Sequence, residues 1–241
     1  MKTSGNTILI TGGSAGIGLA LVKGFAERNN QIIITGRNQS RLDEVVKEFS
    51  NVTAIKSDVS NEEDVLQLVN QIKKDHPLLN VLINNAGVAQ LYELGLNVPA
   101  LDSAKMEIDT NYFSVIRLID LLLPLLSQQP AAAIVNISSI AALRSSKMLP
   151  TYSASKAALH FYTEQLRNGL ATNTNIQVYE VYPPLVNTNF SKAAGGENGI
   201  PPKEVADELI NAFKSNQQEV PIGITKVLHS VLKEAKATLN K

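Results

Sequence analysis

The chain of 241 residues contains no cysteine and no tryptophan, and it has only three histidines. The absence of cysteine excludes disulfides, thiolate nucleophiles and cysteine-ligated metal sites. With so few histidines as well, we expect no metal site.

The sequence also lacks an excess of charge of either sign and a long apolar run. Lys and Arg together number 22, as do Asp and Glu, so no electrostatic attraction to nucleic acid or to an anionic membrane is indicated. The longest apolar stretch, around Leu118–Leu126, contains Asp120 and Pro124 and is shorter than the roughly 20 residues of a spanning helix. The run Ile8–Ile10 is too short for a signal peptide. We therefore expect a soluble, cytoplasmic protein with neither nucleic acid nor membrane as partner.

Short β-rich apolar runs alternate with longer helical patterns along the whole chain. The expected strands are Thr7–Thr11, Gln31–Thr35, Val52–Lys56, Asn80–Ile83, Ala131–Ile137, Ile176–Tyr182 and Glu219–Ile222. The expected helices are Ile17–Arg28, Arg41–Phe49, Glu62–Lys74, Lys105–Leu126, Tyr152–Leu170 and Glu204–Lys214. Such alternation predicts an α/β protein, a single doubly wound Rossmann domain with a mostly parallel seven-stranded sheet and helices on both faces.

The stretch Thr-Gly-Gly-Ser-Ala-Gly-Ile-Gly, residues 11–18, permits two interpretations. Gly12–Gly16 spell G-x-S-x-G, the turn that presents the nucleophilic serine of many hydrolases, here Ser14. That chemistry needs an acid and then a histidine further along, and only His229 lies in a plausible position. The same residues form a glycine turn between a strand and a helix, and the helix N-terminus would favour a dinucleotide pyrophosphate. We favour the dinucleotide turn.

Further motifs follow in a consistent order. They are Asn84-Asn85-Ala86-Gly87, Asn111, Ser139 and Tyr152-x-x-x-Lys156. Together with the glycine turn, this set resembles the classical branch of the short-chain dehydrogenase/reductase (SDR) family, from Thr7 to about Gly223. The resemblance implies one SDR domain over residues 1–241, with residues 1–100 mainly binding a dinucleotide and residues 101–241 supplying catalysis and the substrate site.

The catalytic set implied by the resemblance is Asn111, Ser139, Tyr152 and Lys156. Tyr152 and Lys156 are four residues apart, so their side chains share one face of a helix. A nearby ammonium lowers the pKa of a tyrosine from about 10, and the positive nicotinamide of an oxidised cofactor acts in the same direction. Tyr152 can then act as general acid or base toward a carbonyl or a secondary alcohol, while Ser139 holds the substrate oxygen. By resemblance, Lys156 also binds the nicotinamide ribose and Asn111 supports a water-linked proton relay.

The type of nicotinamide cofactor is indicated by the second expected strand. No acidic residue lies between Gln31 and Asn38, whereas Arg37 stands at the strand's end. Arginine at this point accommodates the 2′-phosphate of NADP, and an acid would favour NAD. We predict NADP(H), with NAD(H) as the alternative. The further cofactor contacts expected from the family pattern are Gly12, Ser14, Gly16, Ile17, Gly18, Asp58, Val59, Asn85, Ala86, Gly87, Pro183, Val186 and Thr188, beside Tyr152 and Lys156.

One motif departs from the usual family pattern. After the sixth expected strand the chain reads Tyr-Pro-Pro-Leu-Val-Asn-Thr, so Pro184 replaces a glycine. Proline fixes φ and removes an N–H, which puts the local loop geometry in question. The Pro-Pro variant is similar to a bacterial subgroup described as DltE-like.

The remaining segments suggest a lid and an interface. Residues 187–202 are rich in small and polar side chains, and we expect them to form a lid over the site; a mobile surface loop is the alternative. Residues 88–96, residues 140–149 and the lid should wall the substrate pocket. We expect this pocket to take a medium-sized carbonyl compound or secondary alcohol.

Apolar residues recur at helical spacing in Thr225–Leu239. They predict that this helix packs on the domain or on a second subunit, or else that it lies on a membrane surface.

Two classes of function stay open at this point. The first is an NADP(H)-dependent oxidoreductase, working as a homodimer or homotetramer as family members commonly do, through Lys105–Leu126 and Tyr152–Leu170. The second is a non-catalytic NADP(H)-binding sensor or scaffold.

Overall fold

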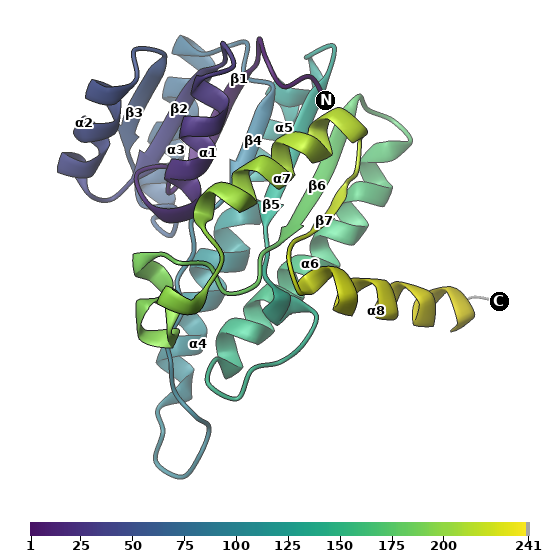
Figure 1. Cartoon of the computed structure of the whole chain (residues 1–241). Helices are drawn as coiled ribbons and strands as arrows, with labels where there is room; N and C mark the ends of the chain where they lie inside the picture. The colour runs from purple at the N-terminus through teal and green to yellow at the C-terminus, as the bar shows by residue number, and fades with distance from the viewer. Residues whose placement is uncertain (240–241) are drawn as a thin grey trace.

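Seven parallel strands form one twisted sheet in the computed structural model, which describes residues 1–239 (Figure 1). The strands lie in the order β3-β2-β1-β4-β5-β6-β7. Their bounds are β1 Thr7–Thr11, β2 Gln31–Gly36, β3 Val52–Lys56, β4 Val81–Asn84, β5 Ala132–Ile137, β6 Ile176–Tyr182 and β7 Glu219–Pro221. The predicted doubly wound α/β fold is therefore confirmed.

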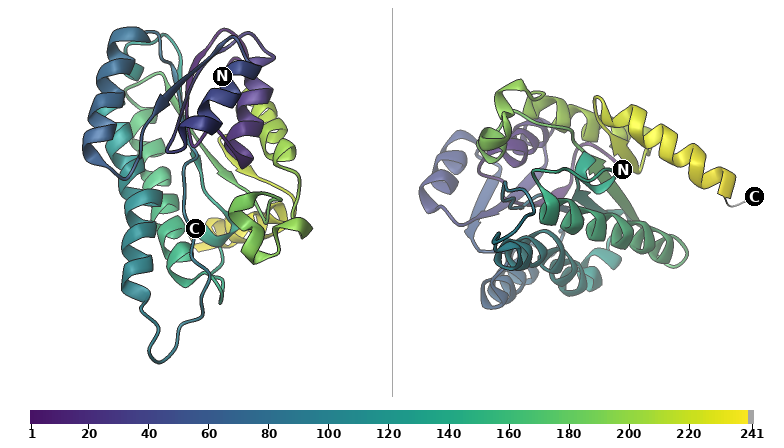
Figure 2. Two further views of the ribbon diagram at one scale, coloured as in Figure 1. Left: turned by 90° about the vertical axis from the view of Figure 1, so that its left-hand side faces the viewer. Right: turned by 90° about the horizontal axis from the view of Figure 1, so that it is seen from below.

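Helices cover both faces of the sheet (Figure 2). One layer consists of α1 Gly16–Ala26, α2 Gln39–Glu48 and α7 Pro202–Ser215; the other consists of α3 Glu62–Asp75, α5 Ser114–Ser127 and α6 Pro150–Ala171. Strand side chains alternate between the layers: Ile8 and Ile10 pack with the first, whereas Leu9 packs with the second. Because both faces are buried, the central strands are runs of aliphatic residues.

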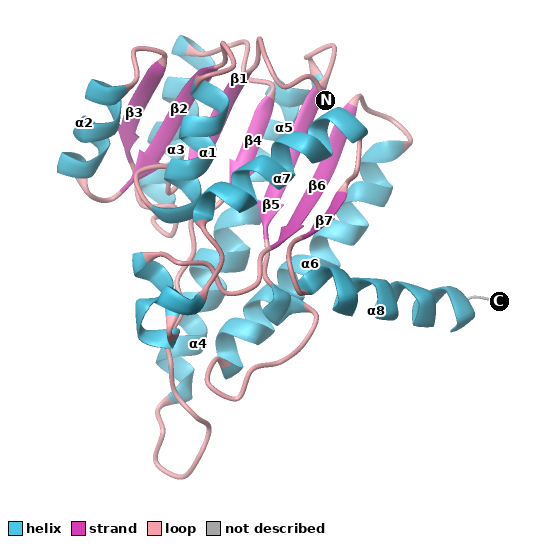
Figure 3. Ribbon diagram, viewed as in Figure 1, coloured by secondary structure: helices cyan, strands magenta, loops and turns pink. Residues whose placement is uncertain are grey.

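The helix expected over Lys105–Leu126 is longer and less regular than predicted. It begins with α4 Ala100–Ile108 and continues as α5 (Figure 3). One π-helical turn at Asp109–Phe113 joins the two, and Pro124 lies inside α5. This continuous helix has 28 residues; its most apolar 18-residue window has a mean hydropathy of 1.2, and half of that window is buried within the fold. Its length and composition would suffice to cross a membrane, but the core helix of a globular domain has the same properties.

The expected lid contains short helical turns. Backbone at Asn189–Ala194 and Gly196–Asn198 forms 3-10 turns. Two backbone hydrogen bonds close the segment at its base, from Asn187 N to Ile200 O (2.8 Å) and from Ile200 N to Leu185 O (2.9 Å). A closed base of this kind holds the segment in a defined place beside the carboxyl ends of the strands.

The C-terminal helix α8, Thr225–Leu239, leads away from the body of the protein beyond β7 (Figure 1). Leu228 and Leu232 are half-buried, while Val227, Val231 and Leu239 are exposed. The apolar stripe therefore packs only in part on its own domain.

The functional segments gather where the chain reverses direction in the sheet. Strand β1 pairs with both β2 and β4, so successive crossovers leave from the two sides of β1. In doubly wound sheets, ligands bind in the crevice outside the carboxyl ends of the strands at this point. The glycine turn after β1 and the Asn84-Asn85-Ala86-Gly87 segment at the end of β4 both lie there.

Candidate active site

The glycine turn has a backbone that other residues would not permit. Gly12 and Gly16 adopt φ values of +66° and +53°, which only glycine reaches without strain. A Cβ on Gly18 would lie 2.2 Å from the carbonyl oxygen of Gly12, so a side chain there would separate α1 from the turn. The turn therefore keeps its backbone open to a ligand at the N-terminus of α1.

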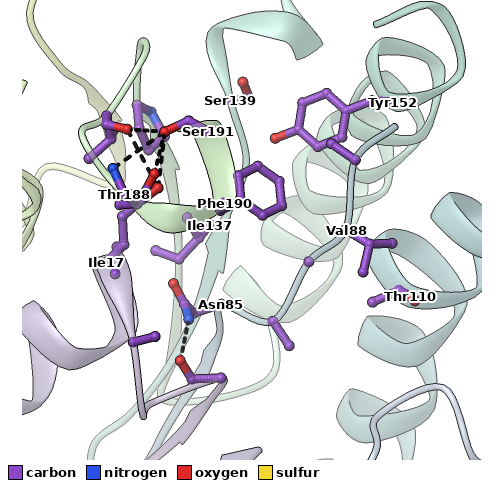
Figure 4. Close-up of a pocket in the computed structure, with 18 of the residues that line it drawn as sticks. Ile17, Asn85, Val88, Thr110, Ile137, Ser139, Tyr152, Thr188, Phe190 and Ser191 are labelled. Atoms are coloured by element: carbon purple, nitrogen blue, oxygen red, sulfur yellow. Dashed lines mark hydrogen bonds between the residues drawn. The ribbon is translucent and has the colours of Figure 1, made fainter. Parts of the chain in front are cut away.

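Asn85 holds the glycine turn from the neighbouring strand. Its side-chain amide donates to the carbonyl oxygens of Thr11 (2.8 Å) and Gly12 (3.2 Å), and one of these bonds is visible in Figure 4. In return, the Thr11 hydroxyl accepts hydrogen bonds from the backbone N–H groups of Asn85 and Ala86, both at 3.0 Å. The Asn85 amide, predicted to contact the cofactor, thus fixes the turn.

A cavity of about 980 Å³ runs along this edge of the sheet. Most of the predicted site residues line it: Gly12, Ser14, Gly16, Ile17, Arg37, Asp58, Val59, Asn85, Ala86, Gly87, Ser139, Tyr152, Lys156, Pro183, Val186 and Thr188. Gly18 and Asn111 are not among the lining residues. The structure therefore brings together, in one cavity, groups that are up to 176 positions apart in the sequence, from Gly12 to Thr188.

Tyr152 and Ser139 face each other across the inner part of the cavity (Figure 4). Ser139 follows β5, and its Oγ accepts a hydrogen bond from Ala141 N (3.1 Å). Burial raises the pKa of Tyr152 to about 12, the Ser139 hydroxyl acts in the opposite direction, and the charge of Glu107 adds to the rise. The protein's own groups thus raise the pKa that we expected to be lowered. The expectation considered the Lys156 ammonium and the positive nicotinamide of an oxidised cofactor, and it omitted the cost of burying a phenolate.

Lys156 lies one helical turn beyond Tyr152 on α6, as the four-residue spacing predicts. Its side chain is 4% exposed, and its Nζ donates to the carbonyl oxygen of Ile137 (2.9 Å). Burial lowers the pKa of Lys156 to about 8, and the charge of Glu180 opposes this change. The Nζ atom lies 5.8 Å from the centre of the Tyr152 ring.

Asn111 lies in the π-helical turn and is fully buried. Its Nδ2 donates to the carbonyl oxygen of Val88 and to the hydroxyl of Ser155, and its Oδ1 accepts from Val88 N, all at 2.9 Å. These contacts hold the cavity wall after β4 against α6. The π-turn is consistent with a site role, since such turns are frequent at functional sites.

Sequence reasoning missed several residues of the site. Arg41 lines the cavity near Arg37, placed there because Asn38 caps α2 by accepting from Arg41 N (3.0 Å). Phe190 of the lid lies 6.2 Å from Tyr152, ring centre to ring centre (Figure 4). Arg41 stands four residues after Arg37, which was a usable signal. Phe190 lies in the segment 187–202 that was expected to cover the site, but no motif singled it out.

The segment Pro183-Pro184 follows β6 directly and lines the cavity, although proline stands where the family pattern has glycine. The carbonyl oxygen of Pro183 accepts from Ile140 N (2.9 Å), and both prolines line the cavity. The loop after β5 is therefore attached to the loop after β6.

The histidine required by the hydrolase interpretation lies elsewhere. His229 Nε2 is 3.7 Å from a Glu219 carboxylate oxygen, and its ring packs on Tyr182. These contacts place it at the β7 edge of the sheet, while Ser14 follows β1. This arrangement does not support Ser14 as a nucleophile.

The family model of the short-chain dehydrogenases matches residues 6–198 of the chain. An uncharacterised oxidoreductase of Bacillus subtilis, DltE, is 35% identical over 225 residues, which cover 91% of this chain and 89% of that protein. An uncharacterised oxidoreductase of Staphylococcus saprophyticus is 30% identical and covers 91% of this chain and 94% of its own length. The chain belongs to the short-chain dehydrogenase/reductase family and is an oxidoreductase of the DltE-like kind.

Solved structures agree with this assignment. A short-chain dehydrogenase of Burkholderia cenocepacia in complex with NADP is 26% identical, with a TM-score of 0.87 over 99% of this chain and 97% of that one. A short-chain dehydrogenase of Sphingobium yanoikuyae in complex with NADPH is 25% identical; its TM-score is 0.85, and the match covers 97% of this chain and 94% of that one. A third, from Burkholderia phymatum in complex with NAD, is 20% identical and shares the fold. Its TM-score is 0.88, and the match covers 100% of this chain and 97% of that one.

Proposed function

We propose that this protein transfers a hydride between NADP(H) and a carbonyl compound or secondary alcohol, with Tyr152 as general acid and base. One observation carries the proposal: the hydroxyls of Ser139 and Tyr152 face the same cavity that the glycine turn enters from the other side. The solved relatives with NADP and NADPH bound support it.

The residues present fit a nicotinamide dinucleotide. The glycine turn offers backbone N–H groups and a helix N-terminus to a pyrophosphate, and the positive φ values of Gly12 and Gly16 give it a backbone shape that glycine adopts without strain. When bound, the cofactor supplies or accepts the hydride. Gly12, Gly16 and Ile17 would hold its phosphates, and Val186 and Thr188 its nicotinamide end.

The chain's own groups provide the proton chemistry. Tyr152 stays protonated at neutral pH because its pKa is about 12, so it is ready to donate a proton to a carbonyl oxygen. Ser139 would hold that oxygen beside the Tyr152 hydroxyl. Lys156 would stabilise the phenolate left after donation, since a nearby ammonium favours the charged form of tyrosine.

The preference for NADP(H) rests on two arginines. Arg37 and Arg41 line the cavity near Asp58, and no acidic residue occupies the end of β2. The Arg37 side chain is 70% exposed and its Nη1 lies 3.8 Å from an Asp58 oxygen, so it is free to turn toward a phosphate. Guanidinium groups bind phosphate oxygens in a planar, bidentate fashion.

A panel of ketones and aldehydes with NADPH, and separately with NADH, tests the proposal. We expect consumption of NADPH with at least one apolar carbonyl compound and a higher kcat/KM than with NADH. Binding of NADPH without turnover on any member would contradict the proposal and favour a non-catalytic sensor or scaffold. A preference for NADH would overturn the cofactor assignment alone.

Assembly and location remain predictions. We expect a homodimer or homotetramer, and the exposed apolar residues of α8 support a role for that helix in subunit contacts. Light scattering on the purified protein would decide the oligomeric state, and a monomer at micromolar concentration would contradict the prediction. We also expect the protein to be cytoplasmic.

A further inference from the structure

A fully buried carboxylate lies on β6, outside the proposed catalytic set. Glu180 is 0% exposed. Its Oε2 accepts a hydrogen bond from the Tyr182 hydroxyl (2.8 Å) and lies 3.1 Å from Nδ1 of His160. Burying a carboxylate is costly unless opposite charge and hydrogen bonds compensate it, so this group calls for an explanation.

Glu180 lies close behind Lys156. His160, which contacts Glu180, follows Lys156 by one turn of α6, so both side chains lie on the same face of that helix. On the sheet side, Lys156 donates to the carbonyl of Ile137, and Ile137 pairs with Val181, the residue after Glu180. The carboxylate and the ammonium therefore occupy the same layer between α6 and β6.

The buried ammonium of Lys156 is stabilised by a negative charge nearby. Its side chain is 4% exposed, and the hydrogen-bond acceptor of its Nζ is a neutral carbonyl. An ammonium in this setting loses hydration without gaining a counter-charge from that contact. The charge of Glu180 raises the pKa of Lys156 and so opposes the effect of burial.

Further charged groups lie on the elements packed around Glu180. They are Glu164 and Arg167 on α6, Glu219 on β7, and His229 and Lys233 on α8. Glu219 is the strand partner of Glu180, but its carboxylate is engaged by His229 (3.7 Å), Lys233 (3.3 Å) and Arg167 (3.9 Å). The negative charge of Glu219 is therefore already compensated by these groups. Glu180 is the carboxylate whose charge raises the pKa of Lys156.

We propose that Glu180, held by Tyr182 and His160, is a positioning residue that keeps the Lys156 ammonium charged behind Tyr152. This inference rests on the proposed function for its catalytic meaning, because only a charged Lys156 stabilises the Tyr152 phenolate. The electrostatic coupling itself exists with or without turnover and can be measured separately.

The test follows the ionisation of Lys156 directly, by NMR of protein labelled with isotope at its lysine side chains. The Lys156 signal is assigned by its loss in Lys156→Met. The wild type should titrate with a pKa of about 8, and Glu180→Gln should lower this value by about one pH unit. Glu219→Gln is the matched control, since it removes a carboxylate on the adjacent strand that is already paired, and it should leave the Lys156 titration unchanged.

Turnover provides the second measurement. In Glu180→Gln, the pH above which kcat/KM for carbonyl reduction falls should move down by the same amount, while Glu219→Gln keeps the wild-type profile. An unchanged Lys156 titration in Glu180→Gln, or an equal shift in Glu219→Gln, overturns the inference. If no carbonyl compound is reduced, the proposed function fails while the NMR titration still decides the role of Glu180.

A second variant makes the test possible if Glu180→Gln does not fold. Replacing the whole cluster, His160→Leu with Glu180→Leu and Tyr182→Phe, removes three mutually paired polar groups together, so none of the three is left without its partner. Such exchanges are often neutral or stabilising. The triple variant should show the same lowered titration of Lys156. A Lys156 titration at the wild-type pH in this variant would contradict the inference.

Discussion

The Nζ atom of Lys156 lies 5.8 Å from the centre of the Tyr152 ring, with both side chains buried against the inner end of the cavity. Burial acts on the two groups in opposite directions, raising the pKa of Tyr152 to about 12 and lowering that of Lys156 to about 8. At neutral pH the pair therefore consists of a protonated phenol and an ammonium close to its ionisation point. This state suits donation of a proton by Tyr152.

Tyr152→Phe should lower turnover by orders of magnitude and leave cofactor binding nearly intact. The substitution removes only the hydroxyl, so the ring still packs beside Phe190, but no group is left to protonate the substrate oxygen. We expect kcat to fall by about 10²–10⁴-fold, the usual contribution of general acid–base catalysis. Steady-state kinetics and NADPH fluorescence titration measure the two effects. Tyr162→Phe, on the same helix, is the control and should keep wild-type turnover; substantial turnover in Tyr152→Phe contradicts the mechanism.

Lys156 should make the stability of the protein rise with pH over a defined window. Its pKa is about 8 in the folded protein and 10.5 when unperturbed. Between these values the unfolded chain binds more protons, so the free energy of unfolding increases with pH. Relative to Lys156→Met, the wild type should gain about 3 kcal/mol from pH 8 to pH 10.5.

Urea denaturation of both proteins at several pH values checks this change. Lys147→Met serves as the control, because that lysine is largely exposed. Its free energy of unfolding should depend on pH as that of the wild type does. If the free energies of unfolding of wild type and Lys156→Met differ by the same amount at every pH from 8 to 10.5, Lys156 titrates normally in the folded state.

Arg37 and Arg41 should set the preference for NADPH over NADH. Each can pair with the 2′-phosphate that only NADPH carries, and a hydrogen bond to a charged group contributes about 1.5–3 kcal/mol. Arg37→Ala should therefore reduce the ratio of the two kcat/KM values by about tenfold, and Arg41→Ala by a smaller factor.

The same ratio should fall as salt is added, because exposed charges are screened. Arg28→Ala, at the far end of α1, provides the control and should leave the ratio unchanged. An unchanged ratio in the Arg37 and Arg41 variants would mean that neither arginine recognises the cofactor.

Much of the fold could be predicted because hydrophobic periodicity depends on local sequence. β1, β3 and β6 occur with the predicted bounds, since each is a short run rich in β-branched and aromatic residues. The π-turn around Asn111 was not predicted, because a single turn with one extra residue is too short to be distinguished in an apolar pattern that is itself irregular. The lid was predicted as a loop because single 3-10 turns lack a sequence signature.

The site was predictable as a set of residues but not as an electrostatic environment. Motif spacing was sufficient to predict that Ser139, Tyr152 and Lys156 lie together, and the three residues line one cavity. The pKa shifts depend on burial and on Glu107 and Glu180, which come close to these residues only in the folded chain. The rise in the pKa of Tyr152 caused by its burial was therefore not predicted.

Phe190 should determine how well the protein binds an apolar substrate. Its ring belongs to the lid, is 51% exposed and lies 6.2 Å from the Tyr152 ring, so a substrate held at Tyr152 would cover it. Burying a phenylalanine against an apolar ligand contributes about 1.5–3 kcal/mol. Phe190→Ala should consequently raise KM for an apolar ketone by about tenfold or more, with a smaller effect on a short aldehyde that does not reach the ring. Leu66→Ala, a half-exposed apolar residue on α3, is the control, and equal KM changes for long and short substrates in Phe190→Ala would show that the lid does not contact the substrate.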